Sequence, residues 1–220
     1  ANHELTERLA EFHRKALDEA KQVYFSGQLF DDFFYGKGST YPDINGSVGV
    51  LFEQASARGQ AQASANGVVT FLTAIANHFA TSISSVQGAL ALKQALINYQ
   101  TEFFSDKQPI EQIRSKGRLI RALNDSARRD ELIHLFNQHQ IQFNYLTKSL
   151  FHSGQEYRPI DSIFVADNQP QQALLSALFD KRTDFIDPTF YDISTWDIES
   201  ALGLNVVPNV TPDIDVLTRR

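Results

Sequence analysis

Apolar positions in the first half of the chain follow two helical stretches separated by a short strand-like run. Residues 3–25 carry apolar side chains every three or four positions, which predicts an amphipathic helix capped by Asn2. The same spacing over residues 67–104 predicts a second helical region, whose long helix begins at the serine-rich stretch 81–85. Between them, the apolar run 47–53 predicts a strand that is buried on both faces.

The second half of the chain alternates between short strands and helices. Three apolar runs predict strands, at residues 119–123, 141–145 and 163–165. A helix capped by Asp125 or Ser126 is expected after the first strand, and a helix with Pro170 in its first turn is expected after the third. Strands that alternate with helices at this spacing predict a parallel α/β sheet.

A polar segment separates these two halves. Residues 105–109, Ser-Asp-Lys-Gln-Pro, are typical of a linker. We therefore expect two domains of the α/β class, residues 1–106 and residues 107–220. The last dozen residues contain Pro212 and directly follow Pro208. They are expected to form an extended tail.

Composition narrows the class of protein. Hydrophobic residues make up 42% of the 220 residues and charged residues 21%, which is typical of a globular chain. The net charge of −6 comes without a basic stripe, which argues against a nucleic-acid partner, and no apolar run is long enough for a membrane span. The absence of cysteine excludes disulfides and thiolate chemistry. Met is also absent and the chain begins with Ala1, so we expect a piece of a longer protein.

Candidate chemistry gathers in a long loop and in the predicted strand that follows it. Residues 26–47 combine five aromatic side chains with glycine and proline turn signals, and long loops of this kind are usually functional. Glu53 ends the predicted strand, and a carboxylate buried there can act as a general base. Tyr35 could close over a substrate and donate its hydroxyl. The alternative is structural: Glu53 would pair with Arg58, and Tyr35 would simply pack.

The block from Tyr35 to Gly59 resembles the C-terminal part of the carboxypeptidase A-type zinc peptidases. In that family a loop tyrosine is followed eight positions later by an aspartate, as Tyr35 is followed here by Asp43. An apolar strand then ends in Phe-Glu, as it does here at Phe52 and Glu53. The block is most similar to a bacterial branch of large secreted zinc carboxypeptidases, which carry almost the whole sequence GKGSTYPD…LFEQAS.

The resemblance implies a peptide substrate and a zinc ion. In the family, a zinc held by two His and one Glu polarises the scissile carbonyl and acidifies a water. Glu53 would then be the general base that takes the proton from that water and returns it to the leaving amine, and Tyr35 would close over the substrate. Asp43 and Arg58 would support them, although Ala55 stands where the family usually has an arginine.

The zinc ligands are not expected in this chain. The family's first ligand pair is His-x-x-Glu, and none of the six histidines has a glutamate three residues later. Each histidine is instead expected at the surface or at a helix cap. In the family the ligands lie upstream of the general base, so here they would precede Ala1. The chain would thus supply the base and loop of a secreted or periplasmic zinc carboxypeptidase, and the upstream part of the catalytic domain would hold the metal.

The second half resembles the class I glutamine amidotransferase-like domain that follows the peptidase in this branch. The resemblance rests on the α/β alternation, the turn 168–171 and the segment 190–196. Amidotransferase chemistry needs a cysteine nucleophile, so this domain is expected to be non-catalytic. Two alternatives remain for the whole protein. One is a non-catalytic peptide- or cell-wall-binding protein on a degenerate peptidase scaffold, and the other is an ordinary α/β protein in which the block is coincidental.

Overall fold

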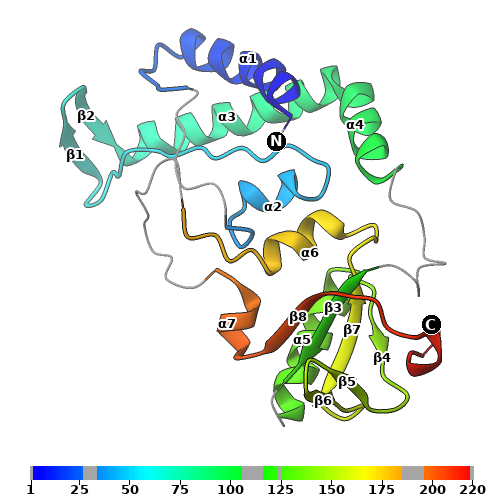
Figure 1. Cartoon of the computed structure of the whole chain (residues 1–220). Coiled ribbons are helices and arrows are strands. Elements are labelled where there is room, and N and C mark those ends of the chain that lie inside the picture. The colour runs from blue at the N-terminus through cyan, green and yellow to red at the C-terminus, as the bar shows by residue number, and fades with distance from the viewer. Residues whose placement is uncertain (1, 27–33, 106–115, 123–124, 185–195, 219–220) are drawn as a thin grey trace. The chain divides into compact units, whose positions relative to one another are not determined.

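The computed structural model describes residues 2–26, 34–105, 116–122, 125–184 and 196–218 (Figure 1). The chain forms two compact units, unit 1 (Ala1–Phe103) and unit 2 (Phe104–Arg220). The two units divide after Phe103, a few residues before the boundary expected after residue 106. The family assigned to each domain stays a prediction.

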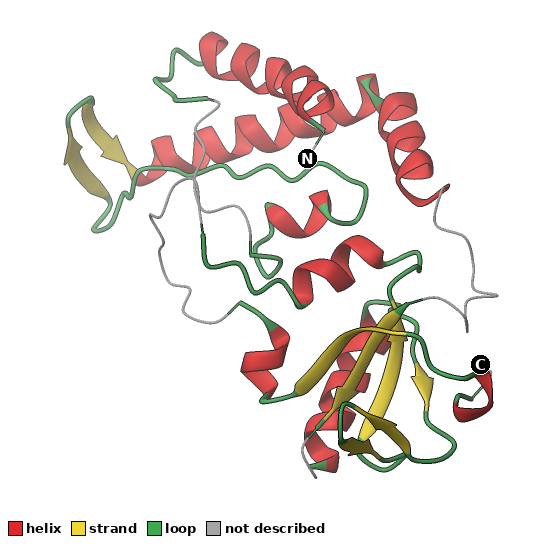
Figure 2. Cartoon of the chain, viewed as in Figure 1, coloured by secondary structure: helices red, strands yellow, loops and turns green. Residues whose placement is uncertain are grey.

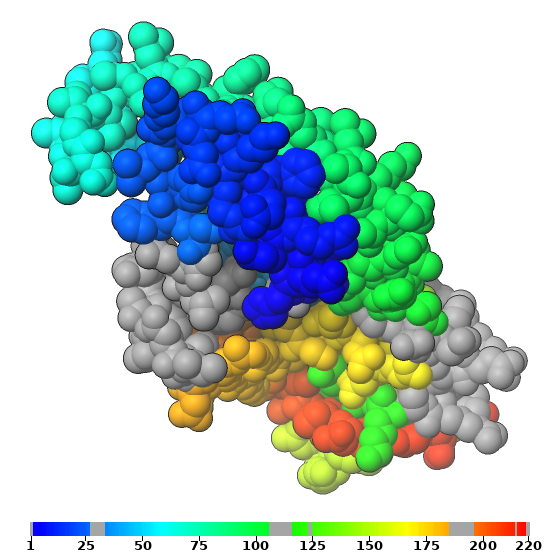
Figure 3. Space-filling model, turned by 90° about the horizontal axis from the view of Figure 1, so that it is seen from above, coloured from blue at the N-terminus to red at the C-terminus, as the bar shows by residue number. Residues whose placement is uncertain are grey.

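Unit 1 consists mainly of helices, with one small hairpin (Figure 2). Its elements are α1 (His3–Glu19), α2 (Thr40–Asp43), β1 (Ala61–Ser64), β2 (Gly67–Thr70), α3 (Phe71–Ala91) and α4 (Lys93–Ser105). α1 lies along α3, and the two helices approach closely because Gly88 of α3 leaves room for α1. A Cβ on Gly88 would meet the side chain of Leu9 at 2.6 Å. The space-filling view shows α1 in blue, with the β1–β2 hairpin in cyan at one end of the unit (Figure 3).

α1 begins where the sequence predicts. The side chain of Asn2 accepts the backbone N–H of Leu5 at 3.0 Å, which caps the first turn. The helix ends at Glu19 rather than near residue 25, and Lys21 follows with a positive φ of 53°. A residue in the left-handed region cannot continue a right-handed helix, so the apolar spacing beyond this point does not extend α1.

The predicted helical region 67–104 is interrupted at its start and again in its middle. β2 precedes α3, and Leu92 separates α3 from α4. The serine-rich stretch 81–85 lies in the middle of α3, so the predicted helix start there is wrong. The hydroxyl of Ser85 donates to the carbonyl oxygen of Thr81 at 2.7 Å, and such a bond accommodates a serine inside a helix.

Residues 47–53 do not form the predicted buried strand. The backbone from Val48 to Ala57 is irregular and pairs with no strand in the part of the chain that the structure describes. Val50 and Leu51 are 39% and 47% exposed. A strand becomes buried on both faces inside a covered sheet, whereas here the segment crosses the helices of unit 1 by itself.

Unit 2 contains a four-stranded sheet. Its strands, in spatial order, are β4 (Asn144–Tyr145), β7 (Ser162–Ala166), β3 (Gly117–Arg121) and β8 (Asn205–Val210). Each neighbouring pair is antiparallel, so the predicted parallel sheet is wrong. The other elements are α5 (Ser126–Gln138), β5 (Leu150–His152), β6 (Gln155–Tyr157), α6 (Gln172–Leu178), α7 (Ile198–Leu202) and a 3₁₀ turn (Ile214–Val216).

The position of β7 explains why the parallel prediction failed. α5 connects β3 to β4, and these two strands point the same way, as a strand–helix–strand unit predicts. They are not neighbours, because β7 lies between them and runs opposite to both. The order of elements therefore predicted the crossover, but it did not predict the strand inserted into it.

The two faces of β7 organise the core of unit 2. Phe164 on β7 is fully buried in an apolar cluster with Leu119 of β3 and Val216 near the C-terminus. Ile163 and Val165 are also buried and, because side chains alternate along a strand, they face the other side of the sheet. Figure 1 shows α5 behind the sheet.

The C-terminal residues are not the extended tail that the prolines predicted. Residues 205–210 form β8, which pairs with β3 although it contains Pro208. Pro208 is tolerated because β8 is the last strand of this sheet's order, where one edge needs no ladder bond. The backbone N–H of Thr147 then donates to the carbonyl oxygen of Val216 at 2.8 Å.

Of the two helix starts predicted in unit 2, the one at α5 is confirmed. The carboxylate of Asp125 accepts the backbone N–H of Ala127 at 3.0 Å and that of Arg128 at 3.3 Å, so Asp125 rather than its neighbour caps α5. Pro170 precedes α6, which begins at Gln172. The predicted strand 163–165 is confirmed in β7. Of the predicted strand 119–123, residues 119–121 form part of β3 and residue 123 lies outside the described residues. Only two residues of the run 141–145 form a strand.

Candidate functional site

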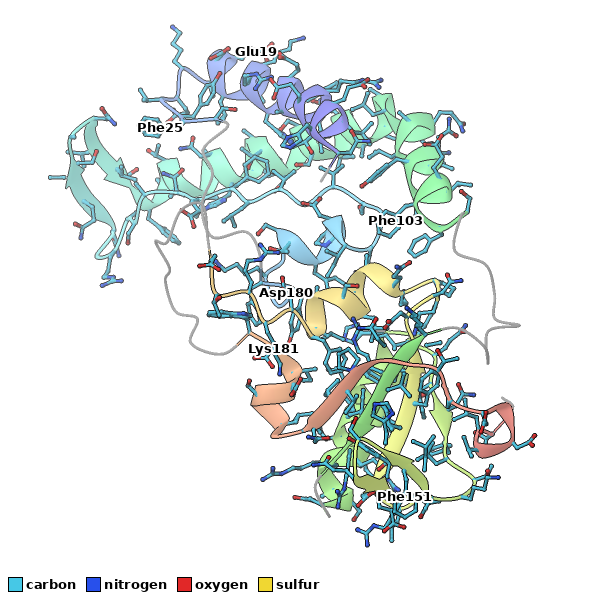
Figure 4. The ribbon with its side chains drawn as sticks, viewed as in Figure 1. Glu19, Phe25, Phe103, Phe151, Asp180 and Lys181 are labelled. Carbon is cyan, nitrogen blue, oxygen red and sulfur yellow. The ribbon has the colours of Figure 1, made fainter. Side chains whose placement is uncertain are left out.

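Two glycines shape the loop around α2. The carboxylate of Asp43 accepts the backbone N–H of Gly49 at 3.0 Å. A Cβ on Gly49 would overlap the carbonyl oxygen of Ser39, so this close approach requires glycine. Gly46 has a φ of 69° and packs against the ring of Phe103, near the end of α4 (Figure 4). Some residues of the block from Tyr35 to Gly59 are therefore needed for the backbone of this loop.

Tyr35 lies just before α2 and is half-buried. Its ring is 4.9 Å from the ring of Phe34, and the two planes are tilted by 52°. Asp43, at the end of α2, holds the backbone of Gly49 and so connects the α2 turn to the segment that leads to Glu53. Tyr35 and Asp43 therefore lie on either side of the short helix α2.

Glu53 lies on an irregular segment that contacts α1 and α3. The ring of Phe52 meets the ring of His13 edge-on, with 4.8 Å between centroids. The side-chain oxygen of Gln54 accepts a hydrogen bond from the amide of Asn77 on α3 at 2.8 Å. The side chain of Glu53, which lies between Phe52 and Gln54 in the sequence, is exposed. The expected burial of this carboxylate is wrong.

Glu53 and Arg58 do not form the ion pair that the structural alternative predicts. Both residues are exposed, and Glu53 makes no hydrogen bond or ion pair with any residue in the described ranges. The backbone of Arg58 belongs to a polar turn, where its N–H donates to the hydroxyl of Ser56 at 3.2 Å. Among the described contacts, none joins Tyr35 or Arg58 to Glu53.

His13, which was expected at the surface or at a helix cap, is a buried residue next to this segment. It is 6% exposed, and its Nδ1 is 2.8 Å from the hydroxyl oxygen of Ser84 on α3. The Ser84 hydroxyl donates to the carbonyl oxygen of Thr81 at 3.0 Å, so it accepts from the Nδ1–H of His13. The Nε2 of His13 is then unprotonated, and it is buried without a partner.

The environment of His13 favours its neutral form. Burial lowers the pKa of His13 below its ordinary value of 6.5, and the charge of Arg14 lowers it further. The available signal in the sequence was spacing, since His13 follows Leu9 by four positions and so shares the face of α1 that packs on α3. His13, on the apolar face of α1, is therefore the residue against which the ring of Phe52 packs.

An open groove of about 980 Å³ lies in unit 1 between residues 54–60 and α3. The α3 wall carries Phe71, Ile75 and Phe79, together with His78. The chain that leads into β1 forms the other wall and runs along α3 (Figure 1). The groove begins one residue after Glu53, at Gln54.

The turn 168–171 in unit 2, which supported the amidotransferase resemblance, contains a fully buried glutamine. The side chain of Gln169 accepts the backbone N–H of Gln142 at 2.8 Å and donates to the carbonyl oxygen of the same residue at 3.2 Å. It also donates to the carbonyl oxygen of Ala166 at 2.7 Å. Gln169 thereby ties the end of β7 to the segment before β4. Of the predicted segment 190–196, residues 190–195 lie outside the described residues.

Within the described ranges, no three His, Asp or Glu side chains are close enough together to hold a metal ion. None of the helices that the structure describes is both long enough and apolar enough to cross a membrane.

Comparison with known proteins found no match to this chain. No family model, no curated protein and no solved structure matches this chain. The resemblance to zinc carboxypeptidases therefore remains a hypothesis based on the block from Tyr35 to Gly59.

Proposed function

We propose that this chain is part of a zinc-dependent carboxypeptidase and that Glu53 is its general base. The block from Tyr35 to Gly59 carries the proposal, because its loop tyrosine, its aspartate eight positions later and its Phe-Glu pair keep the order of the family. The exposure of Glu53 is compatible with this role, since its carboxylate is open to water and to a substrate.

The described residues do not fit a zinc site. A catalytic zinc needs three protein ligands, and no suitable cluster exists among the residues that the structure describes. On this proposal, the metal is held by another part of the catalytic domain, and the present chain contributes proton transfer and substrate contact. The protein would act outside the cytoplasm, as the bacterial branch does.

The proposed work of this chain is a proton relay. Glu53 accepts a proton from the water that attacks the peptide carbonyl, and it passes that proton to the nitrogen as the C–N bond breaks. The carboxylate is thereby regenerated. Tyr35 donates its hydroxyl to the substrate when the loop closes, and Asp43 keeps this loop attached to the Glu53 segment through Gly49.

The test is Glu53→Gln in the gene product that also contains the zinc ligands. Loss of the base is expected to lower kcat by about 10²–10⁴-fold, while elemental analysis finds unchanged zinc. Glu19→Gln is the matched control, because Glu19 is an exposed glutamate at the end of α1 (Figure 4). Full activity of Glu53→Gln would refute the assignment.

A second measurement uses the 220-residue chain itself. Less than one zinc per chain and no release of C-terminal residues are expected. One tightly bound zinc would contradict the proposal, because residues of this chain would then be ligands.

The alternative is a non-catalytic binding protein on a peptidase scaffold. Ala55 in place of the family's arginine and the open groove beside Glu53 favour this second candidate. The sequence that precedes this chain in its gene discriminates the two. An intact His-x-x-Glu followed by a later histidine supports the enzyme, and a broken ligand set supports the binding protein.

A further inference from the structure

The chain contains two Asn-Gly pairs, both in unit 1, and their surroundings differ. Asn66 and Gly67 lie at the turn of the β1–β2 hairpin, which projects from the start of α3 (Figure 1). Asn45 and Gly46 lie in the loop that follows α2. An asparagine amide before glycine is chemically labile, because glycine has no Cβ to keep its backbone nitrogen away from the asparagine side chain. The surroundings of each pair therefore decide how far the fold protects its amide.

The pair at Asn66 is open to solvent. All residues from Ala61 to Gly67 are exposed, and a Cβ built on Gly67 would meet no other part of the structure within 4 Å. The backbone N–H of Asn66 donates to the hydroxyl of Ser64 at 3.2 Å, and that hydroxyl donates to the carbonyl oxygen of Gly67 at 2.8 Å. These bonds hold the main chain of the turn. The side-chain amide of Asn66 bonds to no residue in the described part of the chain, so it is free to rotate.

The pair at Asn45 is held at both residues. Asn45 is half-buried, and its side-chain Nδ2 donates to the carbonyl oxygen of Tyr41 at 2.9 Å. Gly46 is buried, and a Cβ on it would meet the ring of Phe103 at 2.9 Å (Figure 4). Turning the Asn45 amide toward the nitrogen of Gly46 therefore requires breaking a hydrogen bond inside a packed loop.

We propose that Asn66 is a site of spontaneous deamidation and that the fold protects Asn45 from the same reaction. The backbone nitrogen of Gly67 bonds to Cγ of Asn66, the Cγ–Nδ2 bond breaks, and Nδ2 leaves as ammonia with the proton of the Gly67 amide. Water, the only co-reactant, then opens the cyclic imide. Its addition at the side-chain carbonyl breaks the bond from that carbonyl to nitrogen and gives aspartate. Its addition at the main-chain carbonyl breaks the other carbon–nitrogen bond and gives isoaspartate.

Deamidation changes both the charge and the main chain of the hairpin. Either product adds a negative charge to a chain whose net charge is −6. Isoaspartate also routes the main chain through the former side chain and lengthens it by a methylene. This happens inside the short turn whose geometry fixes the pairing of Ser64 with Gly67. The amide hydrogens of β2 should therefore exchange faster in the isoaspartate form than in the unmodified chain.

The test incubates the 220-residue chain in mildly alkaline buffer and follows each asparagine by mass spectrometry. Tryptic cleavage after Arg58 places Asn45 and Asn66 on different peptides. In the folded chain, Asn66 should convert about fivefold faster than Asn45 or more, which corresponds to roughly 1 kcal/mol for the hydrogen bond that Asn45 must break. In urea that unfolds the chain, the two asparagines should convert at similar rates, because each precedes a glycine.

Asn66→Gln is the control variant, because it keeps an exposed amide whose cyclisation needs a larger and less favourable ring. It should stop conversion at this position and leave the rate at Asn45 unchanged. Equal conversion of the two asparagines in the folded chain would overturn the proposal, as would faster conversion of Asn45 or no conversion of Asn66. Unchanged hydrogen exchange of β2 in the isolated isoaspartate form would overturn the expected loosening of the hairpin. No metal, substrate or activity enters these measurements, so they are separate from the test of Glu53.

Discussion

Acidification should destabilise unit 1 through His13. The neutral ring donates through Nδ1 to Ser84, while its buried Nε2 has no partner. Protonation would place an N–H and a positive charge at Nε2, beside the ring of Phe52 and close to the charge of Arg14. A buried charge without a partner is costly, so the folded unit resists protonation.

The sign and size of the effect follow from the lowered pKa. Because burial lowers the pKa of His13 below 6.5, the unfolded chain takes up this proton before the folded chain does. The stability that His13 contributes is complete above the unfolded pKa and is lost as the pH falls through the folded pKa. Between those two values the free energy of unfolding should fall by up to about 1.4 kcal/mol per pH unit.

The assay compares the chain with His13→Gln, in which this proton is absent. Urea unfolding followed by circular dichroism at several pH values gives the free energy of unfolding, and hydrogen exchange of the α1 amides assigns the change to unit 1. The difference between the two proteins should shrink as the pH falls, and His78→Gln, at an exposed position on α3, should keep the slope. A difference that stays constant with pH, or that grows on acidification, would refute the reasoning.

Three further substitutions test the packing of each unit. Phe164→Ala removes a fully buried ring from the core of unit 2 and should cost about 3–5 kcal/mol in urea unfolding followed by the fluorescence of the single tryptophan; a cost below 1 kcal/mol would contradict the described core. Gly49→Ala should lower the melting temperature because its Cβ overlaps a carbonyl, whereas Gly38→Ala, with open space around it, should not; equal shifts would show that the close approach is absent. Gln169→Ala should cost about 1–3 kcal/mol, because the backbone groups it bonds lose their partner; unchanged protection of the Gln142 amide in hydrogen exchange would exclude this role.

Elements with strong local signals could be predicted from the sequence. Asn2 and Asp125 cap helices where their side chains could satisfy the first free N–H groups, and the apolar run at Ile163 forms a fully buried strand. Each of these outcomes depends on neighbours along the chain. The direction of β7 depends instead on which strands accept it as a neighbour, and no local pattern contains that information.

The candidate site shows the same division. The order of Tyr35, Asp43 and Glu53 could be found in the sequence, and so could the glycines that its loop requires. The exposure of Glu53 could not be predicted, because an apolar run becomes a buried strand only when other strands pair with it. The spacing of His13 from Leu9 put it on the face of α1 that packs on α3, but that spacing could not show that Ser84 lies opposite.

Local spacings were enough to predict the caps of α1 and α5, the crossover between β3 and β4, and the residues worth testing as a catalytic site. These depend on spacings of a few residues, where the geometry of helix and strand leaves little choice. The antiparallel order of the sheet, the burial of His13 against Ser84 and the groove beside α3 came only from the folded structure. Those features depend on contacts between residues far apart in the chain, and such contacts are selected by packing and hydrogen bonding of the whole unit rather than by local pattern.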